Sequence, residues 1–336
     1  MKKLSIFLLL SLSYLYSTGQ ASIKELIQIG IENHDAGEYD KAISYYKQAL
    51  EQEPNSSLIN YEISFSYFKK GDNEKAIVYC DKVLKKNDGY ILDAYIIKGS
   101  ALDMQGKTKE SIKLFKKAIK KTEANYLLYF NLALNYYKLG ELEDAEANII
   151  EAINNNPGHA SSHLMLAKIN YKKGNTIPTL LATHFFLLLE PKSARSEDAY
   201  AMLEAKFKGN VTKDAENPNS INITISPNMD KEFGAAELTI ALLQAGNSLE
   251  ENEGKSEDEL FKENTTSFFT IMGELKKENS KGLWWEFYTP FFYDLSKTEH
   301  MEAYCMYISQ SGNENYAAWI EDNQPKLLEF DTWLKE

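Results

Sequence analysis

The sequence predicts an all-α protein in which about five helix hairpins stack one on the next and a smaller helical region follows. Three observations predict this fold class. Glycines recur 34 or 35 residues apart, at Gly37, Gly71, Gly106, Gly140 and Gly174. Between them, apolar residues return at three- and four-residue intervals in two short blocks, the spacing of amphipathic helices. The period ends after residue 193, where further stretches with helical spacing begin. A repeat of this length is typical of units that bury their apolar faces against one another.

The first 20 residues have the layout of a cleavable secretory signal. Two lysines precede an apolar run from Leu4 to about Leu15, and small residues follow at Ser17 and Gly19. We therefore expect a signal peptide at 1–19, a mature chain from about Gln20, and export to the periplasm or the extracellular space. A membrane anchor is the alternative, but the run is shorter than the roughly 20 apolar residues that a span needs. No stable membrane span is expected after cleavage.

Each repeat is expected to be two helices joined at its glycine, because glycine accepts a positive φ at little steric cost. Five residues after the glycine stands a small side chain, Ala42 in the first repeat and Ala76 in the second, which lets the two helices approach closely. Pro54, Pro157 and Pro191 close three of the repeats, where proline stops the helix. The predicted repeats are 23–56, 57–91, 92–125, 126–159 and 160–193.

The first of these units resembles a tetratricopeptide repeat. The residues that carry the resemblance are Leu26, Gly30, Gly37, Tyr39, Ala42, Tyr46, Ala49 and Pro54. The fourth unit matches well, whereas the fifth carries Pro178 at the start of its second helix or inside it, and only a first turn tolerates proline. The resemblance covers residues 23–193 and implies a right-handed superhelix whose concave face, lined by the first helix of each repeat, holds a peptide or a partner helix. It implies binding rather than catalysis.

The positions that the resemblance places in the concave groove are apolar or aromatic. They are Ile27, Ile31, Tyr61, Phe65, Phe68, Phe130, Leu134, Tyr137, Leu164 and Tyr171. Members of the family that hold a terminal carboxylate use lysine and asparagine there, so the two isoleucines argue against a carboxylate clamp. Two alternatives stay open. The side chains either line an open groove for a partner, or they are core shared between hairpins or covered by the C-terminal half, since a large exposed apolar patch is unusual.

The remainder of the chain is predicted to contain three parts. Residues 194–207 are expected to form a helix that caps the last repeat. Residues 208–231 are polar and lack a helical period, which indicates a linker, with a possible short strand in the sequence INITISP. Residues 232–336 are predicted to be a separate acidic helical domain with four helices, in addition to an aromatic stretch that Pro290 interrupts. Its expected core is Trp284, Trp285, Phe287, Phe291 and Phe292.

Charge and chemistry limit the classes of function. From residue 207 onward the chain carries 24 acidic residues and 11 lysines, which argues against binding nucleic acid or anionic lipid. No catalytic or phosphate-binding motif is found, so no catalytic residue, cofactor or metal is predicted. His159 and His163 have the spacing of a two-histidine metal pair, but His159 falls at a turn between repeats. The cluster of Glu299, His300 and Glu302 is interpreted as exposed helix charge.

The two cysteines, Cys80 and Cys305, exclude a disulfide scaffold and a cysteine metal cluster. Cys80 falls at a helix position that is normally buried, so a reduced core thiol is favoured over a single long-range bridge. The function predicted from the sequence is that of an exported protein–protein interaction scaffold, not an enzyme, whose partner is a protein or peptide. The alternative is an enzyme with an unrecognised active site in residues 232–336 and the repeats as an accessory module.

Overall fold

The structure is a computed structural model that describes residues 21–86, 88–123, 125–208, 211–213, 221–223, 232–246 and 254–336. The expected signal peptide therefore lies outside the described residues, as does most of the expected linker. The chain divides into two compact units, Met1–Gly106 and Lys107–Glu336. The division falls inside the third predicted repeat.

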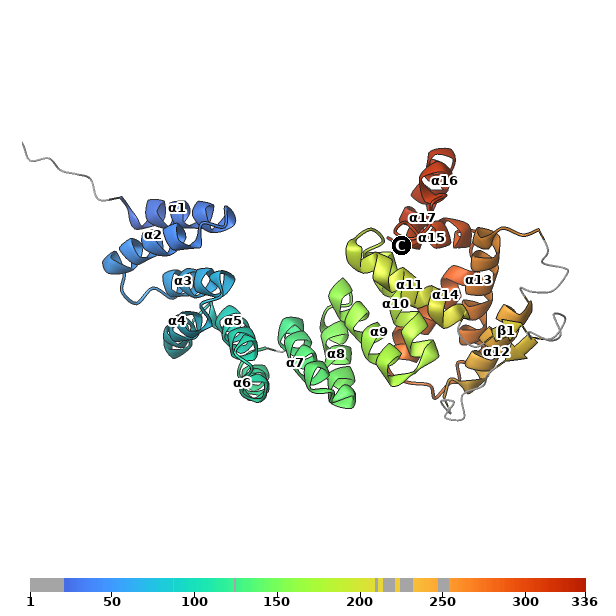
Figure 1. Cartoon of the computed structure of the whole chain (residues 1–336), viewed down its shortest axis with the longest axis horizontal. Coiled ribbons are helices and arrows are strands. Elements are labelled where there is room, and N and C mark those ends of the chain that lie inside the picture. The colour runs from blue at the N-terminus through green and yellow to red at the C-terminus, as the bar shows by residue number, and fades with distance from the viewer. Residues whose placement is uncertain are drawn as a thin grey trace, which may run out of the picture. The chain divides into compact units, whose positions relative to one another are not determined.

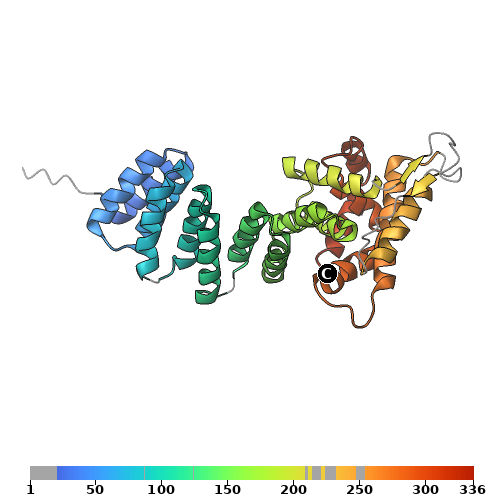
Figure 2. The same cartoon turned by 60° about the horizontal axis from the view of Figure 1, so that its bottom comes forward.

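The described part of the N-terminal unit consists of five helices that lie side by side (Figures 1 and 2). They are α1 (Ile23–Asp35), α2 (Tyr39–Gln52), α3 (Ser57–Lys70), α4 (Asn73–Lys86) and α5 (Ile91–Met104). Gly71 ends α3 with a φ of 89°, and its amide donates to the carbonyls of Tyr67 and Phe68. A Cβ at this position would meet no other atom within 4 Å. The left-handed backbone alone would therefore strain any residue other than glycine here. The turn between the two helices of a hairpin thus depends on the repeated glycine, as the sequence predicts.

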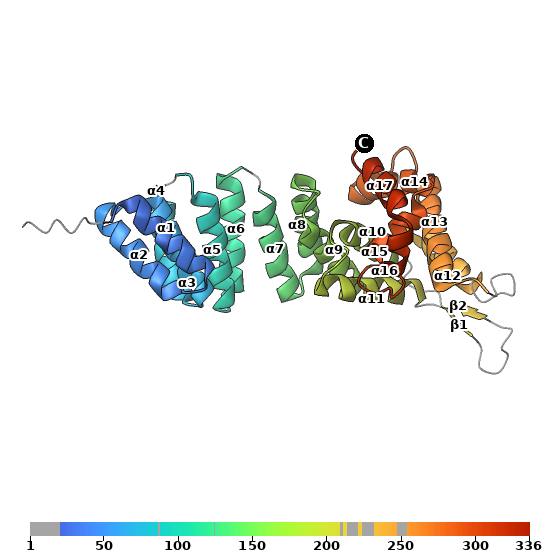
Figure 3. The ribbon, with the colours of Figure 1, turned by 90° about the horizontal axis from the view of Figure 1, so that it is seen from above.

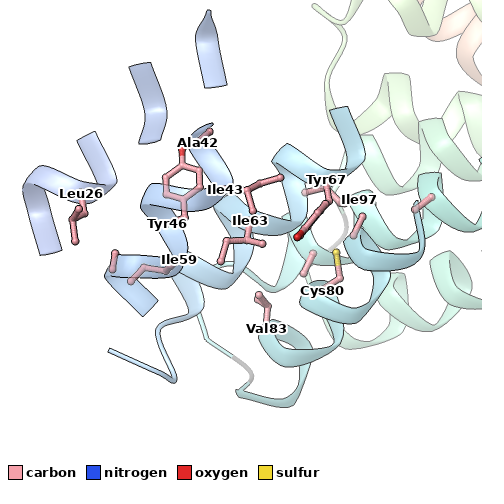
Figure 4. Packing of buried hydrophobic residues seen from close by; sticks show 14 residues of the cluster. Leu26, Ala42, Ile43, Tyr46, Ile59, Ile63, Tyr67, Cys80, Val83 and Ile97 are labelled. Atoms are coloured by element: carbon pink, nitrogen blue, oxygen red, sulfur yellow. The ribbon is translucent and has the colours of Figure 1, made fainter. Parts of the chain in front are cut away.

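The core of the N-terminal unit depends on very small residues where helices cross. Ala42 and Ala76 are fully buried, and Tyr46 lies between α1 and α3 with no exposed surface (Figure 4). A Cβ built on Gly30 would come within 2.3 Å of Cε1 of Tyr46, so only glycine leaves room for the ring. Cys80 lies in the same core as a free, buried thiol.

The C-terminal unit continues the hairpins and then changes its packing. Its repeat helices are α6 (Thr108–Lys121), α7 (Tyr126–Leu139), α8 (Leu142–Asn155), α9 (Ala160–Lys173) and α10 (Thr176–Leu189), followed by α11 (Ala194–Lys208). Pro178 lies in the first turn of α10, where the missing amide costs no helical hydrogen bond. The predicted capping helix corresponds to α11.

The residues after α11 form a strand ribbon and further helices. Strands β1 (Val211–Lys213) and β2 (Ile221–Ile223) pair antiparallel, with Thr212 opposite Asn222 (Figure 3). The helices are α12 (Gly234–Gly246), α13 (Glu257–Leu275), the π-helix η2 (Trp284–Tyr288), α14 (Thr289–Ser296), α15 (Met301–Ile308), α16 (Tyr316–Asp322) and α17 (Gln324–Trp333). The all-α class is confirmed, and β2 falls in the stretch where a short strand was considered.

Two proline positions differ from the sequence-based expectation. The stretch around Pro290 was expected to be interrupted, yet the backbone stays helical from η2 into α14, because the local π-turn accommodates the missing donor. Of the four helices expected in residues 232–336, the last was expected over 314–334, and the structure divides it into α16 and α17 at Asn323, since Pro325 occupies the first turn of a new helix.

The core of the C-terminal unit joins the last hairpin to the helices beyond residue 232. Trp285 and Phe292 are buried as expected, whereas Trp284, Phe287 and Phe291 are half-buried. Helix α10 is almost entirely buried and contacts η2, α12 and α15. Phe185 of α10 meets the ring of Phe287 at a centroid distance of 4.9 Å. The compact unit thus extends upstream of residue 232, and independent folding of residues 232–336 stays a prediction.

Candidate protein-interaction surface

The N-terminal unit brings five of the predicted groove residues onto the first helices of its hairpins. Ile27 and Ile31 lie on α1, and Tyr61, Phe65 and Phe68 lie on α3. All five are half-buried and pack against the core of the unit on one side. Each side chain therefore contributes to the core and also keeps a part of its surface exposed.

Four rings of this unit stack in a row across three successive hairpins. His34 stacks on Phe65 at a centroid distance of 4.6 Å, Phe65 on Tyr61 at 6.1 Å, and Tyr61 on Tyr90 at 5.4 Å. The interplanar angles are 23°, 7° and 21°, so the rings are nearly parallel. We call this set, His34, Phe65, Tyr61 and Tyr90, the aromatic row.

His34 and Tyr90 were not among the groove positions predicted from the sequence. A signal for His34 was available, because it lies three residues after Ile31 and so shares its helix face. Tyr90 is the N-cap residue of α5, outside the helical pattern, and only the folded chain shows that its ring reaches Tyr61.

Burial shifts the pKa of several groups around the aromatic row in the direction that disfavours their charged form. Burial lowers the pKa of His34, whose Nδ1 lies 2.8 Å from Oγ of Ser66. Burial, followed by the charges of Asp93 and Glu62, raises the pKa of Tyr61 to about 12. The pKa of each of these two carboxyl groups is also raised by burial. The row is therefore a neutral aromatic surface at physiological pH, suited to apolar contacts.

The C-terminal unit holds the other five predicted groove residues in less uniform settings. Phe130, Leu134 and Tyr137 of α7 are half-buried, and the side chain of Tyr171 on α9 is 47% exposed. Leu164 departs from the prediction because it is only 5% exposed. Helix α9 packs between α8 and α10 and is also contacted by η2, which leaves this side chain no route to a partner.

The predicted groove rings of α7 and α9 have partners in the same unit. His159 meets Phe130 edge-to-face at 5.0 Å, Lys172 lies 5.0 Å from the ring centre of Tyr137, and Lys206 lies 5.0 Å from that of Tyr171. These cation–π contacts place positive charge beside each tyrosine. In this unit the stacked rings, such as His184 on Phe261 at 6.4 Å and on Tyr304 at 6.0 Å, lie among residues outside the predicted groove.

The histidine pair considered for metal binding is used for structure instead. His163 is fully buried, and its Nε2–H donates to the carbonyl of Pro157 at 2.8 Å. Its Nδ1 then accepts from the hydroxyl of Tyr288 at 2.6 Å, and burial lowers the pKa of His163 to about 4. His159 Nδ1 is bonded to Oγ of Ser162. Across the described ranges, no group of three His, Cys, Asp or Glu residues could hold a metal ion.

The repeated hairpins agree with matches to a known family. Residues 34–94 and 104–169 match a family model described as tetratricopeptide repeat, and residues 7–56 match a second model with the same description. The N-terminal and central region is built of tetratricopeptide repeats. The matched residues end at 169, so α10 and everything beyond it lie outside the matches. Among the described helices, none is long and apolar enough to cross a bilayer.

Two curated proteins are similar to the repeat region. TPR repeat-containing protein YpiA of Bacillus subtilis is 26% identical over 133 residues, 39% of this chain and 31% of that protein. TPR repeat-containing protein MJ1428 of Methanocaldococcus jannaschii is 32% identical over 113 residues, 34% of this chain and 19% of that protein. The chain thus spans less than a third of the length of either relative.

Solved structures also resemble part of the chain. TTC0263, a TPR protein of Thermus thermophilus, aligns with a TM-score of 0.45 and 19% identity over 55% of this chain and 98% of its own. PilW, a type IV pilus biogenesis factor, aligns with a TM-score of 0.47 and 18% identity over 54% of this chain and 86% of its own.

Proposed function

We propose that this protein is an exported interaction scaffold that binds an apolar segment of a partner protein on the aromatic row of its N-terminal unit. The observation that carries the proposal is the stack of His34, Phe65, Tyr61 and Tyr90. Four nearly parallel rings come from three successive hairpins, and Tyr61 and Phe65 are only half-buried against the core of the unit.

The chemistry of the aromatic row favours a neutral apolar or aromatic side chain of the partner as the main contact. Large aromatic side chains dominate the energetics of interfaces, and a few of them usually carry most of the binding free energy. Burial raises the pKa of the neighbouring carboxyl groups of Glu62 and Asp93, which disfavours their charged form. Among the described residues, the only cation over a ring of the aromatic row is Lys69, which lies 5.2 Å from the ring centre of Phe65.

The test compares the capture of partner proteins by the wild-type chain and by two single variants, in each of which one aromatic side chain is replaced by alanine. Phe65→Ala removes the centre of the row, and Tyr79→Ala is the matched control. Tyr79 is a half-buried ring of α4 that stacks on Tyr67 at 5.7 Å and takes no part in the row. We expect Phe65→Ala to lower capture from the host envelope fraction about tenfold, as for a hot-spot residue, with little effect of Tyr79→Ala.

Equal capture by both variants would contradict the assignment of the row as the binding surface. Circular dichroism separates loss of binding from loss of structure, since both truncations remove one partly buried ring. Export is tested in the same fraction by mass spectrometry of the N-terminus. A mature chain that begins near Gln20 supports export, whereas a chain in the envelope fraction that retains Met1 argues against cleavage.

A further inference from the structure

Helix α6, the first helix of the C-terminal unit, exposes a basic face that the proposed scaffold function does not use. Residues 107–121 carry seven lysines and one glutamate, a balance of +6, in a chain whose net charge is −12, so the rest of the chain carries −18. Six of the seven exposed residues of α6 are lysines, namely Lys109, Lys113, Lys116, Lys117, Lys120 and Lys121. The positive charge of the chain is thus concentrated on one helix.

Five of these lysines form a stripe along α6. Because successive residues of an α-helix are about 100° apart, they fall within about 100° of the helix circumference. We call this set, Lys109, Lys113, Lys116, Lys117 and Lys120, the lysine stripe. Lys116 lies 5.3 Å from the ring centre of Tyr136, and the other four form no ion pair with any described residue. Like charges four residues apart destabilise a helix, so an anionic partner on the stripe would relieve a repulsion.

An acidic segment, residues 321–329, lies at the end of α16 and in α17 of the same unit. Glu321, Asp322 and Glu329 are exposed, and within the described part of the chain none of them forms an ion pair. The one lysine of the segment, Lys326, is already paired with Glu302 at 2.7 Å. Leu328 lies beside Glu329 and is 67% exposed. The segment therefore offers free negative charge next to an apolar side chain.

The lysine stripe and the acidic segment do not meet within one copy of the chain. Figures 1 and 3 show α7, α8 and α9 between α6 and the pair of α16 and α17. Within this unit α6 packs on α7, and α16 packs on α15 and α17. The two surfaces have opposite charge, are both exposed and are always present at equal concentration, so a second copy of the chain is the partner that their chemistry fits.

We propose that the lysine stripe of one copy binds the acidic segment of a second copy. The ammonium groups pair with the carboxylates of Glu321, Asp322 and Glu329, and the methylene stems of the lysines cover Leu328. Because the two surfaces differ, each contact leaves one stripe and one acidic segment free. The copies therefore join head to tail, into a ring or an open chain. This association does not depend on the aromatic row.

The test is sedimentation velocity of the full chain over a range of protein concentrations and at two salt concentrations. Exposed ion pairs are weak and are screened by salt, so we expect association at about 50 mM NaCl and monomers at about 500 mM. Vesicles of anionic lipid are tested in parallel, because a lipid surface is another anion that could bind the stripe.

Two charge-reversal variants locate the contact. The stripe variant combines Lys113→Glu, Lys117→Glu and Lys120→Glu. The segment variant combines Glu321→Lys, Asp322→Lys and Glu329→Lys. Each variant alone should associate about tenfold more weakly than the wild type, because like charges then face each other. An equimolar mixture of the two should associate again, since each reversed surface matches the reversed surface of the other variant.

A third variant controls for net charge. It combines Lys276→Glu, Lys277→Glu and Lys281→Glu, three exposed residues between α13 and η2, and it changes the net charge as much as the stripe variant does. It should associate like the wild type. Circular dichroism checks that every variant is folded, which is expected because all the replaced side chains are exposed.

Four results would overturn the proposal. The first is a wild-type chain that stays monomeric at low salt, including the case in which anionic vesicles bind it and the stripe variant does not bind them. The second is association that high salt does not weaken. The third is a mixture of the two reversed variants that stays monomeric. The fourth is equal weakening by the control variant.

Discussion

The stability of the C-terminal unit should fall sharply between pH 6.5 and pH 5, because two histidines are buried in their neutral form. His163 and His184 have no exposed surface, and burial lowers their pKa values to about 4 and about 3 from the ordinary 6.5. Among the described residues, no nearby carboxylate contributes to the pKa of either histidine. His163 is held by Tyr288 and Pro157, and His184 Nδ1 lies 2.9 Å from the hydroxyl of Tyr304 with Nε2 unpaired.

The sign and size of the effect follow from proton linkage. As the pH falls below 6.5, the unfolded chain binds protons at both histidines before the folded chain does, so the free energy of unfolding decreases. The stability is complete above pH 6.5 and is lost progressively as the pH approaches the folded pKa values. At pH 5 each histidine lowers the free energy of unfolding by about 2 kcal/mol, and the two together by about 4 kcal/mol. The total free energy of unfolding of a typical protein is about 5–15 kcal/mol. His159, whose pKa burial also lowers, adds to the same trend.

Urea unfolding followed by tryptophan fluorescence measures this loss of stability in the C-terminal unit. All four tryptophans lie at or beyond residue 284, so the signal reports on the C-terminal unit alone. The control is the double variant His163→Gln and His184→Leu, which is less stable at pH 7 but should lose most of the pH dependence between pH 7 and 5. The reasoning is refuted if the wild-type chain loses less than about 1 kcal/mol over this range, or if the variant keeps the full dependence.

Two further predictions concern packing. Gly30→Ala should lower the stability of the N-terminal unit by about 1–3 kcal/mol, because the new Cβ overlaps the ring of Tyr46. Gly89→Ala is the control and should be nearly neutral, because neither a contact nor a positive φ opposes a side chain there. Thermal unfolding followed by circular dichroism measures both changes. Limited proteolysis within 208–231 should leave two fragments that stay associated on gel filtration, because residues beyond 232 share a buried core with α10. Fragments that separate and stay folded would instead support an independent domain.

The repeat architecture could be predicted from the sequence because its determinants are local. Helix spacing follows from apolar periodicity, and the turn follows from a glycine that alone adopts the φ of 89° at Gly71 without strain. The small residues at the helix crossings follow from the same rule, and the fully buried Ala42 and Ala76 confirm it. The place of Ile27, Ile31, Tyr61, Phe65 and Phe68 on α1 and α3 was also predictable, since it depends on helix register alone, and their role in a groove stays a prediction.

The contacts that define the candidate sites depend on the tertiary structure. Tyr90 joins the aromatic row from outside any helical pattern, and Leu164 leaves the predicted groove because other helices cover α9. The hydrogen bond of His163 to Tyr288 joins residues 125 positions apart. Local sequence determines which helices form, but pairings at this separation depend on how all the apolar surfaces are buried together, and no short pattern records that.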